Sequence, residues 1–254
     1  MGILCVSTSS TTTDAFSFVA PSHKTASSSS LNSRKTKLFM ATAGPIACRP
    51  VGIGSAAPKT VITNVDLEGV VETSDEWIRT RTGISQRRVL TCPGNEDNKS
   101  EGQDDESLVD LSSAAAKNAL EMSGMNPEDV DLIICATSSP DDLFGDATTV
   151  AKNLGCTNAF AFDLTAACSG FLFGLVTAGQ FMDRKGSGVK KAIVVGADAL
   201  SRWVDWDDRN SCILFGDGAG AMVLEGTSDG DGTCGLLGYS AHSNGKGHDD
   251  LMCG

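Results

Sequence analysis

Residues 159–183 read A-F-A-F-D-L-T-A-A-C-S-G-F-L-F-G-L-V-T-A-G-Q-F-M-D, and the pattern changes once along this stretch. The first part, Ala159–Leu164, is short, apolar and partly aromatic, which predicts a β-strand. A helix is predicted to follow from about Cys168 to Asp183, where Ala, Leu, Phe and Gly predominate. Because this helix is apolar nearly all round, we expect it to be buried at the centre of the fold.

Strand and helix patterns alternate along the rest of the chain. The further predicted strands are 49–55, 131–137, 191–196, 211–215 and 219–225. The further predicted helices are 64–71, capped by Asn64, 74–83, 107–122 and 147–154. The helix that Ser107 opens has apolar residues at helical spacing, namely Leu108, Leu111, Ala115, Ala119 and Met122. This alternation predicts an α/β fold in which helices flank a mostly parallel or mixed sheet.

Composition and charge exclude several classes of protein. The 254 residues carry a net charge of −12, which argues against a nucleic-acid partner because phosphate binding needs a positive field. The longest apolar runs, such as Leu132–Ala136, are too short to cross a membrane. The nine cysteines contain no C-x-x-C pair, so we predict reduced thiols that mostly fill the core, and no metal site.

The first 45 residues differ in composition from the remainder. Serine and threonine dominate residues 7–13 and 25–30, and Asp14 is the only acid before Asp66. A Ser/Thr-rich, basic and acid-poor segment is typical of a transit peptide, although a merely disordered tail is the alternative. We therefore predict a targeting segment over residues 1–45 and a folded domain over residues 46–254.

Cys168 has two interpretations when it is judged from spacing alone. A thiol at a strand-to-helix corner lies where unpaired N–H groups and the helix dipole favour the thiolate, as in a nucleophile elbow. The alternative is a small buried residue that packs against the start of the helix. The spacing favours neither interpretation of Cys168 over the other. The three histidines, His23, His242 and His248, lie in the presumed presequence or in a Gly/Ser/Asn-rich stretch, so none is a convincing base.

Four stretches together resemble ketoacyl-ACP synthase III, the condensing enzyme that starts type II fatty acid synthesis. They are V-E-T-S-D-E-W-I-R-T-R-T-G-I (71–84), A-F-D-L-T-A-A-C-S-G-F (161–171), V-V-G-A-D-A-L-S-R-W-V-D-W-D-D-R (194–209) and C-I-L-F-G-D-G-A-G-A (212–221). The resemblance runs from about residue 49 to residue 245 and is closest to the plastid type. It implies the amino-terminal half of a thiolase-like fold and a location in the plastid stroma.

The resemblance also implies roles for individual residues. Cys168 would be the nucleophile that takes an acetyl group from acetyl-CoA and passes it to a carbanion made from malonyl-ACP. Trp77 and Arg209 match the pair that holds the CoA adenine, and Thr73 and Arg81 match further CoA contacts. Phe144 matches a residue that shapes the partner subunit's acyl pocket, which implies a homodimer. Without the family, Trp77 reads as a half-buried packing residue and the two arginines as surface ion pairs.

The family's G/P-H-Q-A-N-type and G-N-T-S-A-type motifs, which carry the catalytic His and Asn, do not occur in these 254 residues. The sequence therefore resembles a C-terminally truncated member, and we expect an exposed apolar face and doubtful full activity. The alternatives are another thiolase-superfamily acyltransferase, such as a polyketide synthase or a hydroxymethylglutaryl-CoA synthase, or a non-catalytic fragment or interaction subunit. A cysteine hydrolase is a further alternative, which fits the sequence less well. No cofactor is expected beyond the CoA and ACP thioester substrates.

Overall fold

A computed structural model describes residues 48–93, 106–183, 186, 188–227, 235–241, 243 and 246. All of them belong to one compact unit, Ala41–Gly254. The predicted targeting segment 1–45 and the acidic stretch 94–105 lie outside the described residues, as do all three histidines. None of the helices in the described ranges is long and apolar enough to span a membrane.

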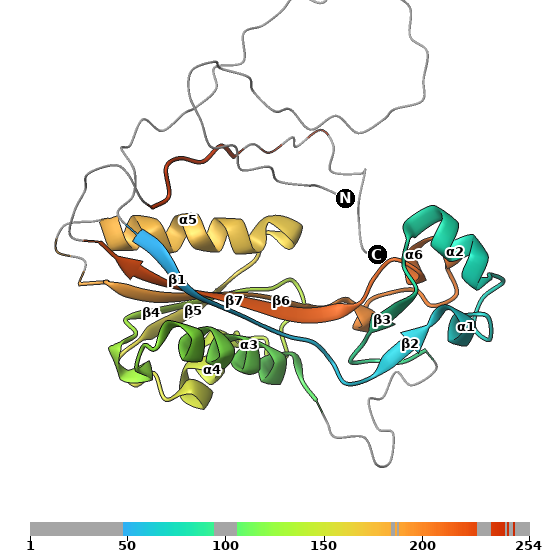
Figure 1. Cartoon of the computed structure of the whole chain (residues 1–254), viewed down its shortest axis with the longest axis horizontal. Helices are drawn as coiled ribbons and strands as arrows, with labels where there is room; N and C mark the ends of the chain where they lie inside the picture. The colour runs from blue at the N-terminus through green and yellow to red at the C-terminus, as the bar shows by residue number, and fades with distance from the viewer. Residues whose placement is uncertain are drawn as a thin grey trace, which may run out of the picture. The chain divides into compact units, whose positions relative to one another are not determined.

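A five-stranded mixed sheet forms the centre of this unit, in the order β1-β7-β6-β4-β5 (Figure 1). β4 pairs in parallel with both β5 and β6, whereas β7 runs antiparallel to β6 and to β1. The strands are β1 (Cys48–Ala56), β4 (Leu132–Ala136), β5 (Phe160–Leu164), β6 (Lys191–Ala199) and β7 (Asp217–Gly226). The predicted α/β class with a mixed sheet is therefore confirmed.

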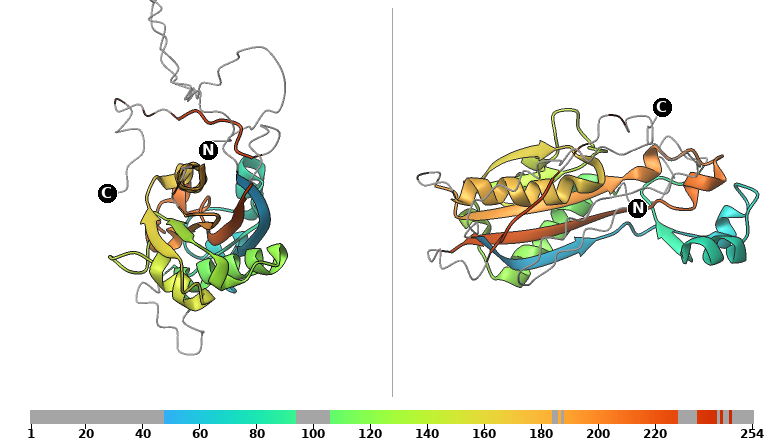
Figure 2. Two further views of the ribbon diagram at one scale, coloured as in Figure 1. Left: turned by 90° about the vertical axis from the view of Figure 1, so that its left-hand side faces the viewer. Right: turned by 90° about the horizontal axis from the view of Figure 1, so that it is seen from above.

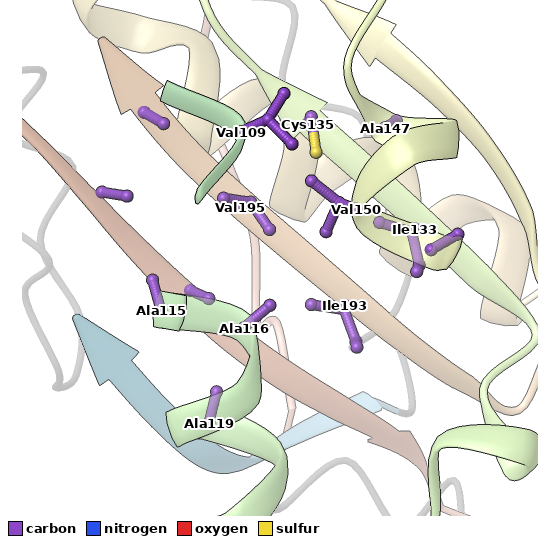
Figure 3. Packing of buried hydrophobic residues seen from close by; sticks show 14 of the residues in the cluster. Val109, Ala115, Ala116, Ala119, Ile133, Cys135, Ala147, Val150, Ile193 and Val195 are labelled. Carbon is purple, nitrogen blue, oxygen red and sulfur yellow. The ribbon is translucent and has the colours of Figure 1, made fainter. Parts of the chain in front are cut away.

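Helices cover both faces of the sheet, as the two views in Figure 2 show. On one face lie α3 (Leu108–Ser123) and α4 (Ala147–Leu154), and on the other lies α5 (Gly170–Asp183). The side chains of β4 alternate between the two layers: Ile133 packs with the α3 and α4 cluster shown in Figure 3, and Ile134 packs with the α5 cluster. Strand 4 is buried throughout, as its continuous apolar sequence predicts.

The predicted burial of α5 is confirmed on its sheet-facing side and is wrong for its opposite side. Every fourth residue, namely Gly170, Gly174, Ala178 and Met182, is buried against the sheet. The opposite side exposes Phe173 and Gln180, and Phe181 is exposed at the flank, where its ring contacts Phe160 and Phe162 of β5. A sheet covers only one stripe of a helix, so apolar composition alone overestimated the burial.

Glycines in β1 allow α3 to lie directly on the sheet. A Cβ atom at Gly52 or Gly54 would collide with the carbonyl oxygens of Ala119 and Ala115 on α3. The predicted apolar stripe of α3 is buried except at its last member, Met122, which is 65% exposed. The Met122 sulfur instead accepts a hydrogen bond from Ile53 N (3.3 Å), so this side chain contacts the edge strand β1 and not the core.

A smaller substructure lies at the end of the sheet where β6 finishes (Figure 1). Its elements are β2 (Val61–Thr63), α1 (Asn64–Leu67), α2 (Asp75–Thr82), β3 (Gln86–Arg88) and α6 (Arg209–Cys212). Ser74 caps α2 and Gly83 ends it, as predicted. Its apolar core includes Leu67 and Ile78, both fully buried.

Two predictions in this substructure are wrong. Thr63, not Asn64, caps the first short helix, because its side chain accepts from Asp66 N in a capping box. Residues 211–215 do not form a strand. Ser211 and Cys212 end the short helix α6, whose N-terminal cap is Asp208. Cys212 and Ile213 are buried by contacts from distant parts of the chain.

Candidate active site

Cys168 lies on a tight turn between β5 and α5. The turn is a single 3₁₀ segment, Ala167–Ser169, closed by a 3.1 Å hydrogen bond from Ser169 N to Ala166 O. Ala167 has φ +44°, in the left-handed region that a residue with a Cβ atom seldom adopts. Backbone strain of this kind persists where the surroundings enforce it and is frequent beside reactive groups.

The surroundings of this turn leave the thiol accessible. Thr165 Oγ1 donates to Thr137 O (2.8 Å), which ties the turn to the end of β4. A Cβ atom at Gly170 would lie 3.1 Å from Ala136 Cβ, so the start of α5 needs a glycine to sit on that strand. Cys168 itself is exposed, and the alternative that it fills the core is therefore wrong.

The other described cysteines have the opposite environment. Cys48, Cys135, Cys156 and Cys212 are buried and Cys92 is partly buried, so the prediction of core thiols is confirmed for most of the six described cysteines. Burial raises the pKa of Cys156 to about 11, and burial also raises the pKa of Cys135 well above its ordinary value. Thiols that remain protonated near neutral pH are poor nucleophiles, so Cys168 is the best placed reactive thiol of this set.

Trp77, Arg81 and Arg209 come together at the contact between α2 and α6. The guanidinium carbons of Arg81 and Arg209 lie 4.2 Å and 4.6 Å from the centre of the Trp77 ring. Arg209 also donates to Glu72 O (3.0 Å), which joins the first residue of α6 to the chain before α2. The indole and the two guanidinium groups form the surface that we call the arginine–tryptophan clamp.

The clamp is closed on itself. A base stacked between two planes needs them roughly 7 Å apart, because each stacking contact takes about 3.5 Å. The distances of Arg81 and Arg209 from Trp77 leave no such gap, so a flat ligand has to displace a guanidinium group. Both arginines are exposed, so either can move aside once its hydrogen bond to Trp77 O or Glu72 O breaks. The buried hydroxyl oxygen of Thr73 has no hydrogen-bond partner within the described part of the chain.

The clamp and Cys168 lie at the same end of the sheet, where the parallel strands finish. β5 and β6 both run parallel to β4, so their carboxyl ends meet there, and β6 leads on to α6 while β5 leads to Cys168. An open depression of about 450 Å³ lies at this end, lined among others by Ala167, Phe171 and Gly218. Binding sites in sheets with parallel strands commonly lie at the carboxyl ends of those strands.

Phe144 lies on the loop before α4, together with Leu143. These two side chains are 94% and 92% exposed. Carboxylates hold the loop in place: Asp163 accepts from Asp146 N (2.8 Å), and Asp146 accepts from Asp141 N (2.9 Å). Burial raises the pKa of Asp146. Two adjacent apolar side chains on an ordered, solvent-facing loop are typical of a contact surface.

Known proteins are similar to this chain in sequence. The family model of 3-oxoacyl-[acyl-carrier-protein (ACP)] synthase III matches residues 162–245, which include Cys168 and Arg209. A beta-ketoacyl-[acyl-carrier-protein] synthase III from Synechococcus sp. is 57% identical over 195 residues, which cover 77% of this chain and 52% of the relative. Over most of its length, this chain is similar to part of beta-ketoacyl-ACP synthase III. A chloroplastic synthase III from Arabidopsis thaliana is 47% identical over 92% of this chain and 53% of its own length.

Solved structures of the synthase III family share the fold. The 3-oxoacyl-[acyl-carrier-protein] synthase III of Aquifex aeolicus superimposes with a TM-score of 0.63 at 43% identity, covering 72% of this chain and 55% of that one. The thiolase-like fold is thereby confirmed. The chain spans about half the length of the relatives that it matches.

The roles of other residues near this candidate site were missed from the sequence. Arg87 and Asn64 are buried beneath the clamp, and Asp217 is buried where β7 begins. No local signal marks them, because an exposed strand arginine or a turn acid looks the same in a sequence. Within the described ranges, no three His, Cys, Asp or Glu side chains gather in a way that would hold a metal ion.

Proposed function

We propose that Cys168 accepts the acetyl group of acetyl-CoA, and that the enzyme to which this chain belongs condenses it with malonyl-ACP. The observation that carries the proposal is the exposed thiol on the β5–α5 turn. It lies at the same end of the sheet as the arginine–tryptophan clamp. Similarity to beta-ketoacyl-ACP synthase III supports the proposal. The reaction uses the CoA and ACP thioesters as substrates and needs no further cofactor.

The first half-reaction is a transfer between two sulfur atoms. Cys168 Sγ forms a bond to the carbonyl carbon of acetyl-CoA, the bond from that carbon to the CoA sulfur breaks, and CoA departs as the thiol with the proton. Malonyl-ACP then loses CO₂, and the electron pair left on its carbon attacks the acetyl carbonyl. The Cys168 thiolate leaves, and acetoacetyl-ACP is the product.

The described residues support the first half-reaction more fully than the second. Decarboxylation needs a group that polarises the malonyl thioester, and a histidine is the usual side chain for such work in the family. His23, His242 and His248 all lie outside the described residues. The proposal for the described part of the chain is therefore acyl transfer to Cys168, and condensation is proposed for the complete enzyme.

The clamp provides the site for the nucleotide part of CoA. Once a guanidinium group has moved aside, the adenine can stack on the Trp77 ring and be covered by Arg209, since both present flat faces. Arg81 is then placed for the phosphates, to which a guanidinium group donates paired hydrogen bonds. The unpartnered Thr73 hydroxyl offers one more hydrogen bond to the ligand.

Acetyl-CoA alone tests the proposal. We expect the intact mass of the protein to increase by one acetyl group, and peptide mapping to place that group on Cys168. Iodoacetamide should compete with this transfer and label Cys168 before the other eight of the nine cysteines, because burial raises the pKa values of Cys135 and Cys156. No adduct, or an adduct on another thiol, would contradict the proposed function and favour a non-catalytic role.

The second proposed partner is another copy of the same protein. Leu143 and Phe144 project from an ordered loop, and β5, the strand next to that loop's helix, is an edge of the sheet. Phe160, Phe162 and Phe181 form an aromatic group beside this edge, with ring centres 5.5–6.4 Å apart. Exposed aromatic side chains beside an open strand edge favour self-association.

Replacing Phe144 by aspartate should weaken that association. We expect the mass measured by light scattering to fall from that of a dimer toward that of a monomer, since a charge would have to be buried in an apolar contact. The matched control is Val65→Asp, which changes an exposed apolar residue far from the loop in sequence and should leave the mass unchanged. An equal effect of both substitutions, or none from Phe144→Asp, would rule out this surface.

The plastid is the proposed location. Residues 1–45 have the composition of a transit peptide, and the Arabidopsis relative is named as chloroplastic. Cyanobacterial proteins, such as that of Synechococcus sp., are also similar to this chain, and they say nothing about a plastid.

A further inference from the structure

Arg87 is a buried arginine beneath the arginine–tryptophan clamp. It is 6% exposed, whereas its neighbour on β3, Arg88, is exposed. Arg87 donates from one terminal nitrogen to Asn64 Oδ1 (3.0 Å) and from the other to Ile213 O (2.9 Å). Both acceptors are neutral, and the Nε atom of Arg87 has no partner among the described residues. Burial of a guanidinium group with so little compensation is unfavourable, so it calls for a reason other than stability.

Asn64 continues the contact from Arg87 to α2. This side chain is 1% exposed, and its amide nitrogen donates to Asp75 Oδ1 (2.8 Å) and to Ile84 O (2.8 Å). Asp75 is the first residue of α2 and lies two residues before Trp77. The hydrogen bonds from Arg79 and Asn64 lower the pKa of Asp75.

Ile213 continues the contact from Arg87 to α6. It is the C-terminal cap residue of that helix, whose first residue is Arg209. Arg209 donates to Glu72 O, in the chain before α2, and its guanidinium group contacts the Trp77 ring of α2. The two helices that carry the clamp are therefore joined twice, on the solvent side by exposed groups and on the buried side by Arg87.

We propose that Arg87 is a positioning residue that holds α2 and α6 at a fixed separation, and thereby sets the width of the clamp for the flat base of a nucleotide. The inference rests on the proposed function, because that base is the adenine of CoA. The exposed arginines have to move when the base enters, whereas the buried contact stays in place. Geometry that is held before binding reduces the ordering needed on binding.

Binding of CoA to the protein, measured by calorimetry, tests the role of Arg87. We expect Arg87→Met to raise the Kd for CoA roughly tenfold, as the loss of part of one stacking contact would do. Arg87→Lys should lie between this variant and the wild type, because an ammonium group does not span Asn64 and Ile213 as a planar fork does. Arg88→Met is the matched control on the same strand, and Trp77→Ala gives the effect of losing the clamp entirely.

A second readout separates positioning from general support of the fold. Acetylation of Cys168 by the acetyl thioester of N-acetylcysteamine, which has no nucleotide, should proceed at the wild-type rate in Arg87→Met. A CoA affinity that is unchanged in Arg87→Met overturns the inference alone, and so does an equal loss of CoA binding and of acetylation by the short thioester. A wild-type protein that binds no CoA overturns both the inference and the proposed nucleotide site.

Discussion

Replacing Cys168 by alanine is expected to abolish acetyl transfer from acetyl-CoA while leaving the fold intact. The thiol is the only group of this side chain that forms a bond to the acetyl carbon, so the transfer should fall below detection. Because Cys168 is exposed, its loss should change the free energy of unfolding by less than about 0.5 kcal/mol. The measurements are intact mass after exposure to acetyl-CoA and denaturant unfolding of the same sample.

The matched control for this substitution is Cys92→Ala. Cys92 is the other described cysteine that is not fully buried, and burial raises its pKa. Its replacement should leave acetylation unchanged. Persistence of the adduct in Cys168→Ala, or its loss in Cys92→Ala, would place the acceptor elsewhere and remove the observation on which the proposed function depends.

Replacing Asp217 by alanine should cause the largest loss of stability of the substitutions considered. This buried carboxylate accepts from Leu90 N (2.6 Å), Ser201 N (2.9 Å) and Ser201 Oγ (2.5 Å). It thus joins the start of β7 to the chain after β3 and to the turn after β6. Removing it leaves two buried donors of Ser201 and the partly buried Leu90 N without this acceptor, and we expect the free energy of unfolding to fall by about 3–5 kcal/mol.

Denaturant unfolding followed by circular dichroism measures this loss. Asp217→Asn keeps the shape and one acceptor oxygen, so it should cost less than Asp217→Ala. Asp129→Ala provides the control, because Asp129 forms an exposed ion pair with Lys191 (2.9 Å) and should contribute no more than about 1 kcal/mol. Similar losses for Asp217→Ala and Asp129→Ala would show that the buried contacts of Asp217 do not hold these segments together.

Much of the local structure could be predicted from the sequence. Ser74 and Gly83 bound α2, Ser107 caps α3, and α4 spans Ala147–Leu154, all as predicted. Caps and turns of this kind involve residues within a few positions of one another, so a local pattern contains the information. The same reasoning placed Cys168 on the turn between a strand and a helix, although it left open whether the thiol was buried.

The errors involve contacts between residues far apart in the chain. Residues 211–215 have the apolar content of a strand, yet Cys212 and Ile213 are buried in one cluster with Leu67 of α1 and Ile78 of α2. Ser211 and Cys212 form the end of α6. Asn64 has the side chain of a helix cap, but it is enclosed and bridges Arg87 and Asp75. A short segment with two possible conformations adopts the one that its distant neighbours stabilise.

By itself, the sequence determined the α/β class, the resemblance to the synthase III family and the identity of the candidate nucleophile, since these depend on periodicity and on motifs read along the chain. Only the tertiary structure decided that Cys168 is exposed, that one side of α5 is uncovered and that Arg87 lies buried beneath the clamp. The physical reason is that solvent exposure and hydrogen-bond partners are properties of packed elements. Two arginines adjacent in the sequence, Arg87 and Arg88, therefore have different environments, one joining two helices and the other facing solvent.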